Sequence, residues 1–478
     1  MTSEESFLQA IRDAPDDDEL RLVFADWLEE HDDPHGELMR LEVALARLDG
    51  GDDRRQRLEA RSRKLRREHR DRLIGPWVRR LYDWGYPRGL LSVAAHVSGF
   101  FPLGPEVAHL LPWIERLKLA GVNRSDGQAL ARLWQLPHLT ALDLRHNHLG
   151  PEAASVLVEL PNLVHLRRLC LWGNALGDAG AATLLRSSRL ERLTALDLSR
   201  NGLTAETARH IARAEHLSCL ESLDLRGSAL GAAGVAQLAS AAHLGSLRQL
   251  YLGHCVLGDE GVRAQAEGTL PPAGLRQLLL EGNRLGPEAV SALAGSAFAE
   301  SLEELTLTDN PLGAEGAVRL SHSPLWPGLR SLSLFHCQLG DEGVLALARA
   351  GPTALTDLDL GENGLGPRAA RALANSPLLA GLSRLGLNGN LLGDEGARLL
   401  AESPNAVHLR ELHLEDNNIS DVGAVLLGRS PYLRNLRSLH IDRNPIRRAG
   451  QAALRYCLHI LEELTPTDGR PVHRRSRR

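Results

Sequence analysis

Residues 382–400 read LSRLGLNGNLLGDEGARLL, and the pattern of this stretch decides the fold. Leu385 and Leu387 alternate with smaller or polar residues, which predicts a short strand with one buried face. After Gly393 the apolar residues recur at the spacing of a helix. The stretch therefore predicts one unit made of a strand, a turn and a helix.

The same unit recurs twelve times between Leu139 and Ile446, with the consensus Leu-x-x-Leu-x-Leu-x-x-Asn-x-Leu and intervals of 26 to 28 residues. One unit cannot bury its own leucines, and only the stacking of neighbours does so. We therefore predict an α/β solenoid of horseshoe shape. Its parallel strands would form a concave sheet, and its helices would lie on the convex side.

The Asn position of the consensus has a mechanical role. An Asn side chain offers two donors and an acceptor, so in a buried turn it can satisfy backbone groups of its own and the adjacent unit. We expect Ser and Cys to do the same with smaller groups. The predicted structural ladder comprises Asn147, Asn174, Asn201, Ser228, Cys255, Asn283, Asn310, Cys337, Asn363, Asn390, Asn417 and Asn444.

These motifs resemble the ribonuclease-inhibitor-like class of leucine-rich repeats, over roughly residues 90–457. The class includes inhibitors, GTPase-activating proteins and immune receptors, so the resemblance implies a fold and leaves the function open. Two degenerate units precede the regular ones. Residues 114–119 fit the strand half of a unit, whereas residues 90–95 have lost the strand pattern. Atypical terminal units are expected as caps.

Residues 1–48 have a different pattern, which predicts a small segment of three helices. LVFADWLEE at 22–30, Asp33-Pro34 and ELMRL at 37–41 resemble the short repeat-companion domain of some bacterial proteins. The resemblance implies no active site. We expect one helix face to carry Leu20, Val23, Phe24, Trp27 and Leu28, with Phe24 and Trp27 in the core. We also expect the segment to be separable, so that a chain beginning near Arg88 still folds.

Two basic segments flank the repeats. Residues 49–89 form a junction in which ten Lys or Arg stand against three acids between Arg54 and Arg72. We interpret this stretch as a solvated helix, because no aromatic residue interleaves for base stacking. Residues 458–478 hold a closing segment and a basic tail, which we expect to be disordered.

Composition excludes several classes of function. The net charge of −5 and the pI of about 6.5 argue against a nucleic-acid partner. No secretory signal and no long apolar run are present, so we expect no membrane association. The five cysteines do not have the spacing of a disulfide framework, which favours a reducing compartment and thus the cytoplasm. We find no catalytic motif and no metal-binding spacing, so we predict a noncatalytic chain without metal or cofactor.

The strand positions that point away from the leucines supply the candidate binding residues. The first five copies place four Arg and three Asp there, whereas the last seven place ten acids and two Arg. Aromatic residues framed by charge are typical of interface centres. The predicted protein-binding residues are Trp172, Tyr251, Phe335, Asp357, Asp359, Glu362, Glu411, Glu415 and Asp416.

Three functions are compatible with these features. The first is a protein-interaction scaffold that binds a protein partner, with a basic partner favoured by the acidic half. The second is a GTPase-activating or GTPase-regulating protein, for which Arg124 is a candidate by position. The third is an enzyme inhibitor of the ribonuclease-inhibitor type.

Overall fold

The computed structural model describes residues 3–48, 53–101, 103–268, 274–350, 353–457 and 463–465. The chain divides into two compact units, of which unit 1 comprises Met1–Leu203 and Arg213–Asp224, and unit 2 comprises Thr204–Ala212 and Leu225–Arg478. The basic tail expected after residue 465 lies outside the described residues. No described helix is both long enough and apolar enough to cross a membrane.

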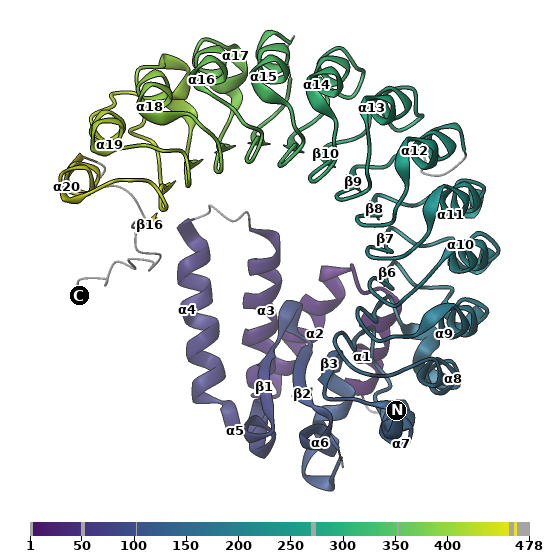
Figure 1. The fold of residues 1–478 in the computed structure, drawn as a ribbon. Coiled ribbons are helices and arrows are strands. Elements are labelled where there is room, and N and C mark those ends of the chain that lie inside the picture. The colour runs from purple at the N-terminus through teal and green to yellow at the C-terminus, as the bar shows by residue number, and fades with distance from the viewer. Residues whose placement is uncertain are drawn as a thin grey trace. The chain divides into compact units, whose positions relative to one another are not determined.

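Unit 1 begins with helices and continues into strand–helix repeats (Figure 1). Its α-helices are α1 (Ser3–Asp13), α2 (Asp18–Glu30), α3 (Pro34–Arg47), α4 (Asp53–Glu68), α5 (Arg70–Leu73), α6 (Val97–Phe100), α7 (Gly127–Ala131), α8 (Glu152–Val158) and α9 (Gly177–Leu185). Its 3-10 helices are η1 (Gly75–Arg79), η2 (Pro87–Gly89), η3 (Pro105–Trp113), η4 (Arg124–Asp126), η5 (Arg132–Gln135), η6 (Pro161–His165), η7 (Ser188–Leu190) and η8 (Glu215–Leu217). Its strands are β1 (Leu81–Gly85), β2 (Leu91–His96), β3 (Ile114–Ala120), β4 (Ala141–Asp143), β5 (Arg168–Cys170), β6 (Ala195–Asp197) and β7 (Ser222–Asp224).

The three N-terminal helices start where their capping residues predict. The Asp17 carboxylate accepts a hydrogen bond from the Glu19 N–H at the start of α2, and Asp33 with Pro34 begins α3 in the same way. Phe24 is buried, as expected, but Val23 is 53% exposed. The prediction that Val23 shares the buried face is therefore wrong, because it lies one residue outside the packed stripe of α2.

Side chains of α1–α3 pack on Trp113, the last residue of η3 before β3. The Phe24 ring stacks on Trp113 with centroids 5.5 Å apart, and the centroid of the His35 ring lies 4.2 Å from that of Trp113. The Trp113 indole N–H donates to Glu4 in α1 at 2.9 Å. These contacts cross the expected boundaries at residues 48 and 89. The helices are part of one compact unit with the first repeats. The independent folding of a chain that begins near Arg88 stays a prediction.

The start of the sheet differs from the expected pattern. β1 was not predicted, and it pairs antiparallel with β2. β2 forms where the leucine pattern is lost, because Leu91, Val93 and Ala95 alternate inward and are buried. From β2 to β7 the strands of unit 1 are parallel where their pairing is described. Both degenerate repeats therefore contribute strands to the sheet, with Val and Ala beside Leu91 as the buried residues of β2.

Unit 2 repeats one parallel strand and one helix many times, with the helices on one side of the sheet (Figure 1). Its strands are β8 (Gln249–Tyr251), β9 (Gln277–Leu279), β10 (Glu304–Thr306), β11 (Ser331–Ser333), β12 (Asp357–Asp359), β13 (Arg384–Gly386), β14 (Glu411–His413), β15 (Ser438–His440) and β16 (Glu463–Thr465). Its helices are α10 (Ala205–Ala212), α11 (Gly231–Leu238), α12 (Gly258–Glu267), α13 (Pro287–Ala294), α14 (Gly313–Ser321), α15 (Gly340–Arg349), α16 (Pro367–Ala374), α17 (Pro377–Gly381), α18 (Gly393–Ala401), α19 (Asp421–Gly428), α20 (Arg448–Cys457), η9 (Ala242–Leu244) and η10 (Pro404–His408). The predicted α/β solenoid with parallel strands is confirmed.

The strands pair in register, so equivalent positions of neighbouring repeats face each other. Leu358 of β12 pairs with Leu385 of β13, and Leu385 pairs with Leu412 of β14. All three leucines are fully buried. A residue on the outward side of one strand therefore lies beside the residue 26 to 28 positions away, which decides which side chains can form a site.

The amides at the Asn position connect each repeat to the preceding one. The Asn390 Oδ1 accepts hydrogen bonds from the N–H groups of Asn363 and Leu365, both at 3.0 Å. Its Nδ2 donates to the carbonyl oxygens of Leu360 and Leu387, at 3.1 and 2.8 Å. The side chain is buried, so these bonds replace water for four backbone groups.

The smaller residues at this position reproduce only part of the pattern. The Cys337 thiol donates to the Leu307 carbonyl of the preceding repeat at 3.1 Å, and burial raises the pKa of Cys337 to about 12. The Cys255 thiol bonds to Leu225 in the same way, at 3.3 Å. The Ser228 hydroxyl is buried without a hydrogen-bond partner. The ladder is therefore weaker at Ser228 than at its asparagines.

Asn390→Ala should lower the free energy of unfolding by roughly 1–3 kcal/mol, because the substitution leaves buried backbone groups without partners. Urea denaturation of the two proteins would measure the loss. Asn388→Ala, two residues earlier and half-buried, serves as the control and should change stability much less. Equal unfolding midpoints for Asn390→Ala and the wild type would show that the amide is dispensable.

Candidate functional site

The candidate site is the outward side of the strands, which we call the strand face. It consists of the third, fifth, seventh and eighth positions of each repeat. Trp172 lies on the strand face of unit 1, and Tyr251, Phe335 and the six predicted acids lie on that of unit 2. Trp172, Tyr251 and Phe335 are half-buried against their neighbours, so each presents part of its ring to solvent.

The eighth position adopts a left-handed backbone conformation in all twelve regular repeats. Four copies hold glycine there, with φ between 64° and 69°, and the other eight hold larger residues with φ between 51° and 56°. The larger residues are His146, Arg200, His254, Asp309, His336, Glu362, Asp416 and Arg443. A side chain in this conformation costs about 1–2 kcal/mol. The strand face thus keeps polar and charged side chains where glycine would be less strained.

Trp172 is the centre of a cluster in unit 1. The guanidinium carbons of Arg145 and Arg200 lie 6.0 and 5.9 Å from the Trp172 ring centroid, and the His146 ring lies 4.1 Å away. Arg145 is held by Asp143, whose carboxylate is 2.7 Å from its Nε. This hydrogen bond raises the pKa of Arg145. The cluster presents an aromatic ring near two positive charges, and that of Arg145 is held in place by Asp143.

The two aromatic residues of unit 2 are held differently. The Arg226 guanidinium lies 5.4 Å from the Tyr251 ring centroid, and the Tyr251 hydroxyl is 3.1 Å from the Gln277 Oε1. The Phe335 ring covers the backbone at Gly361, because a Cβ at that glycine would come within 2.6 Å of the ring. Only a residue without a side chain at 361 leaves room for this position of Phe335.

Two acids of the predicted acidic half are already paired with an arginine. The Arg384 Nε lies 3.2 Å from the Asp357 Oδ1 and 3.5 Å from the Glu411 Oε2. Arg384 therefore sits between a carboxylate of the preceding repeat and one of the following repeat. Among the described residues, Asp359, Glu362 and Asp416 form no ion pair, and they carry the uncompensated charge of this region.

A histidine cluster on the same face was not anticipated from the sequence. The His413 Nε2 lies 2.8 Å from the Glu411 Oε1, and its Nδ1 lies 3.4 Å from the Glu415 Oε1. The hydrogen bond to Glu415 raises the pKa of His413. Burial acts to raise the pKa of Glu415, but the bond to His413 lowers it overall. The signal was available, since His413 and His440 occupy the fifth position of consecutive repeats.

The basic helix α4 has aromatic neighbours that the sequence analysis did not predict. The Arg66 guanidinium lies 6.0 Å from the Trp84 ring, and Tyr82 of the unpredicted strand β1 is 56% exposed nearby. Arg63 and Arg66 line a surface hollow together with Tyr82 and Trp84. Aromatic residues therefore do accompany the basic helix, although they come from β1 and not from the helix itself.

Comparison with known families gives one match. The family model described as "Leucine Rich repeat" matches residues 135–158, 216–239, 244–264, 299–321, 329–348, 352–374 and 405–428. Each matched segment falls on the repeats described above. No curated protein matches the chain in sequence.

Solved structures with a similar arrangement share little sequence with this chain. An internalin from Listeria monocytogenes is 20% identical, with a TM-score of 0.42, over 69% of this chain and 86% of that one. A chain of the Rad7 and Elc1 complex from yeast is 21% identical, with a TM-score of 0.41, over 60% of this chain and 80% of that one. The chain in the Drosophila Toll–Spatzle complex is 17% identical, with a TM-score of 0.41, over 75% of this chain and 50% of that one.

Proposed function

We propose that this leucine-rich-repeat protein is an interaction scaffold, and that it binds a protein partner on the strand face. The observation that carries the proposal is the Trp172 cluster of unit 1. A half-buried tryptophan between two arginines combines the residue types that contribute most to protein interfaces. The ring supplies apolar area, and the guanidinium groups supply directed hydrogen bonds for carboxylates of the partner.

The left-handed eighth position supports the same proposal. Glycine would avoid strain at Arg200 and His146, yet both keep side chains that approach Trp172. Strain that persists at surface positions is typical of residues with a binding role. The strain does not identify the partner, but it indicates that these side chains have a use beyond stability.

The charges of unit 2 suggest which partner groups would be attracted there. Asp359, Glu362 and Asp416 favour basic groups, whereas Asp357 and Glu411 already share the positive charge of Arg384. A basic segment of the partner would therefore bind near the three uncompensated acids. Of the six acidic residues predicted from the sequence, we therefore propose that these three attract the partner.

Trp172→Ala should raise the dissociation rate of the partner about 30-fold, since an aromatic anchor contributes about 2 kcal/mol or more to binding. The partner is first captured from the source cell with the wild-type chain, and the rate is then measured by surface plasmon resonance. Trp134→Ala is the matched control, because Trp134 is 58% exposed in η5 and lies off the strand face. Equal rates for Trp172→Ala and the wild type would contradict the proposal.

A second set of variants tests the acidic region of unit 2. Neutralising Asp359, Glu362 and Asp416 together should slow association several-fold and reduce its dependence on salt. Glu260→Gln, at an exposed position of α12, should leave the association rate unchanged. The identity of the captured protein separates the alternatives. A small GTPase would favour a GTPase-regulating role, and a single hydrolase would favour an inhibitor.

A further inference from the structure

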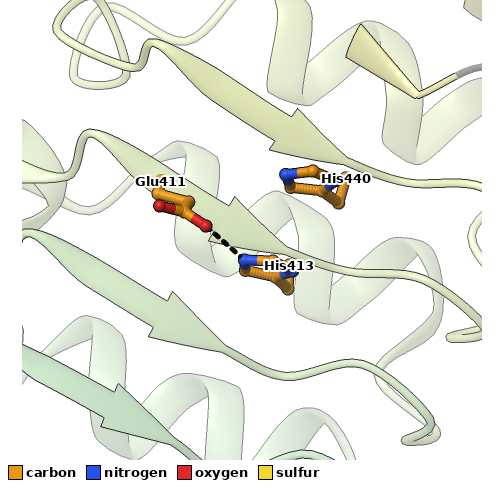
Figure 2. Close-up of side chains that lie close together, drawn as sticks. All are labelled: Glu411, His413 and His440. Atoms are coloured by element: carbon orange, nitrogen blue, oxygen red, sulfur yellow. Dashed lines mark hydrogen bonds and ion pairs between the residues drawn. The ribbon is translucent and has the colours of Figure 1, made fainter. Parts of the chain in front are cut away.

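A cluster of two histidines and one glutamate lies on strands β14 and β15 of unit 2. His413 pairs in register with His440, so the two side chains leave the sheet side by side. Their rings are stacked, with centroids 4.3 Å apart and planes inclined by only 6° (Figure 2). Because the strands are parallel and in register, equivalent nitrogen atoms of the two rings come near each other.

Glu411 completes the group from the same strand as His413. It lies two residues earlier on the outward side, and its Oε1 is 2.8 Å from the His413 Nε2. Figure 2 shows this pair on one strand and His440 on the next. One ligand atom from each of the three residues lies within 4.8 Å of the other two. All three side chains are partly exposed, so an ion can reach them from solvent.

We propose that Glu411, His413 and His440 form a binding site for a divalent transition-metal ion, with Zn²⁺ as the best fit. Two imidazoles and one carboxylate are a donor set that Zn²⁺ accepts, whereas Mg²⁺ and Ca²⁺ require oxygen ligands. Zn–N bonds of about 2.0–2.1 Å need the ligand atoms somewhat closer together than they lie here. The three side chains are partly exposed, so small rotations about their side-chain bonds can bring the ligand atoms closer together.

Glu415 occupies the position of an outer-sphere partner. Its Oε1 lies 3.4 Å from the Nδ1 of His413, on the opposite side of the ring from Glu411. Metal-binding histidines almost always donate their second ring N–H to a carboxylate or carbonyl, which fixes the ring orientation. Glu415 is half-buried and has a second oxygen without a hydrogen-bond partner. The ring is thus already oriented with its Nε2 toward Glu411.

Two neighbouring groups modify the site. The Ser438 hydroxyl is 2.8 Å from the His440 Nε2 and would have to release that nitrogen. The Arg384 Nε is 3.5 Å from the second carboxylate oxygen of Glu411, and its positive charge opposes a cation. Arg384 is more than half exposed and can withdraw toward Asp357. Three protein ligands leave a fourth position for water or another external donor.

The spacing of the proposed ligands along the chain explains why the sequence analysis did not predict a metal site. His413 and His440 are 27 residues apart, so they form no short metal-binding motif. The expectation of no metal rested on linear spacing alone. In a stacked array, the equivalent position of the next repeat is a nearer neighbour than most residues of the same repeat.

Isothermal titration of the full chain with ZnCl₂ tests the proposal. The wild type should bind one equivalent through this site, and His413→Ala or His440→Ala should each weaken that binding at least 100-fold. Glu415→Gln should weaken it about 10-fold, as expected for an outer-sphere partner. Arg384→Gln should strengthen it several-fold, because it removes the opposing charge. His408→Ala, an exposed histidine in η10, is the control and should leave binding unchanged.

The protein has twenty histidines, so weak binding elsewhere must be separated from this site. Thermal melting of each variant without metal confirms that the fold is retained, and Glu411→Gln provides a variant of nearly equal shape. Added Zn²⁺ should raise the melting temperature of the wild type but not that of the His413→Ala/His440→Ala double variant. Wild-type affinity in the double variant, or no binding by the wild type, would overturn the proposal.

Discussion

Arg21→Met should lower the free energy of unfolding of unit 1 by roughly 3–5 kcal/mol, the usual cost of breaking a buried ion pair from one side. Arg21 is only 1% exposed, and its Nη2 lies 3.6 Å from the Glu115 Oε1 on β3. Its Nε donates to the Arg88 carbonyl at 3.1 Å. Removing the guanidinium leaves the buried Glu115 carboxylate with only the more exposed Arg116, whose Nε lies 3.5 Å from the other carboxylate oxygen. The substitution also removes a connection between α2 and the first strands.

The double variant Arg21→Met/Glu115→Gln provides the critical comparison. It removes both charges, so it should recover a large part of the lost stability. Arg57→Met, at an exposed position of α4, should change stability by less than about 0.5 kcal/mol. Urea denaturation followed by tryptophan fluorescence reports on unit 1, where Trp113 contacts α1–α3. If Arg21→Met unfolds like Arg57→Met, the helices do not depend on this ion pair.

The stability of unit 1 should also fall in mild acid because of His138. This imidazole is 8% exposed, and its Nδ1 has no hydrogen-bond partner. Burial, together with the positive charge of Arg12, lowers the pKa of His138 to about 4. In the unfolded chain the pKa returns to about 6.5. Between these two values the unfolded state binds more protons than the folded state, so stability is present above pH 6.5 and is lost as the pH falls toward 4.

The expected loss from His138 is about 2–3 kcal/mol between pH 7 and pH 4. His138→Leu should therefore show a flatter dependence of unfolding free energy on pH than the wild type does. His165 shifts in the same direction and remains in both proteins, so the difference between the two curves isolates His138. His109→Asn, at an exposed position of η3, is the control. Parallel curves for the wild type and His138→Leu would refute the assignment.

The regular repeats could be predicted because their information is local. A strand at 384–386 follows from alternation within a few residues, and the buried Leu385 follows from the same pattern. β1 and the packing of α2 could not be predicted in this way. They depend on contacts such as Arg21 with Glu115, which join residues 94 positions apart and have no periodic signal.

The positions of the candidate site residues could be predicted from the sequence, but the side chains with which they pair could not. Trp172 and Phe335 were placed on the outward side from the repeat pattern, and the structure places them on that side. The compensation of Asp357 by Arg384 was missed because charges were counted per region and not paired between repeats. In-register stacking makes such pairs predictable once the repeats are aligned, as the pairing of His413 with His440 also illustrates.

The amide ladder has a direction along the chain. The Asn444 Oδ1 accepts from the N–H groups of Asn417 and Ile419, just as the Asn390 Oδ1 accepts from those of Asn363 and Leu365, so both oxygens reach back toward the N-terminus. Loss of a repeat on the C-terminal side therefore leaves backbone N–H groups of the repeat before it without a hydrogen-bond acceptor. Within the ladder, loss on the N-terminal side frees only a side chain, which can turn to water. Fraying should proceed from the C-terminal end, with amide hydrogen exchange fastest there and slowing repeat by repeat toward the interior of unit 2.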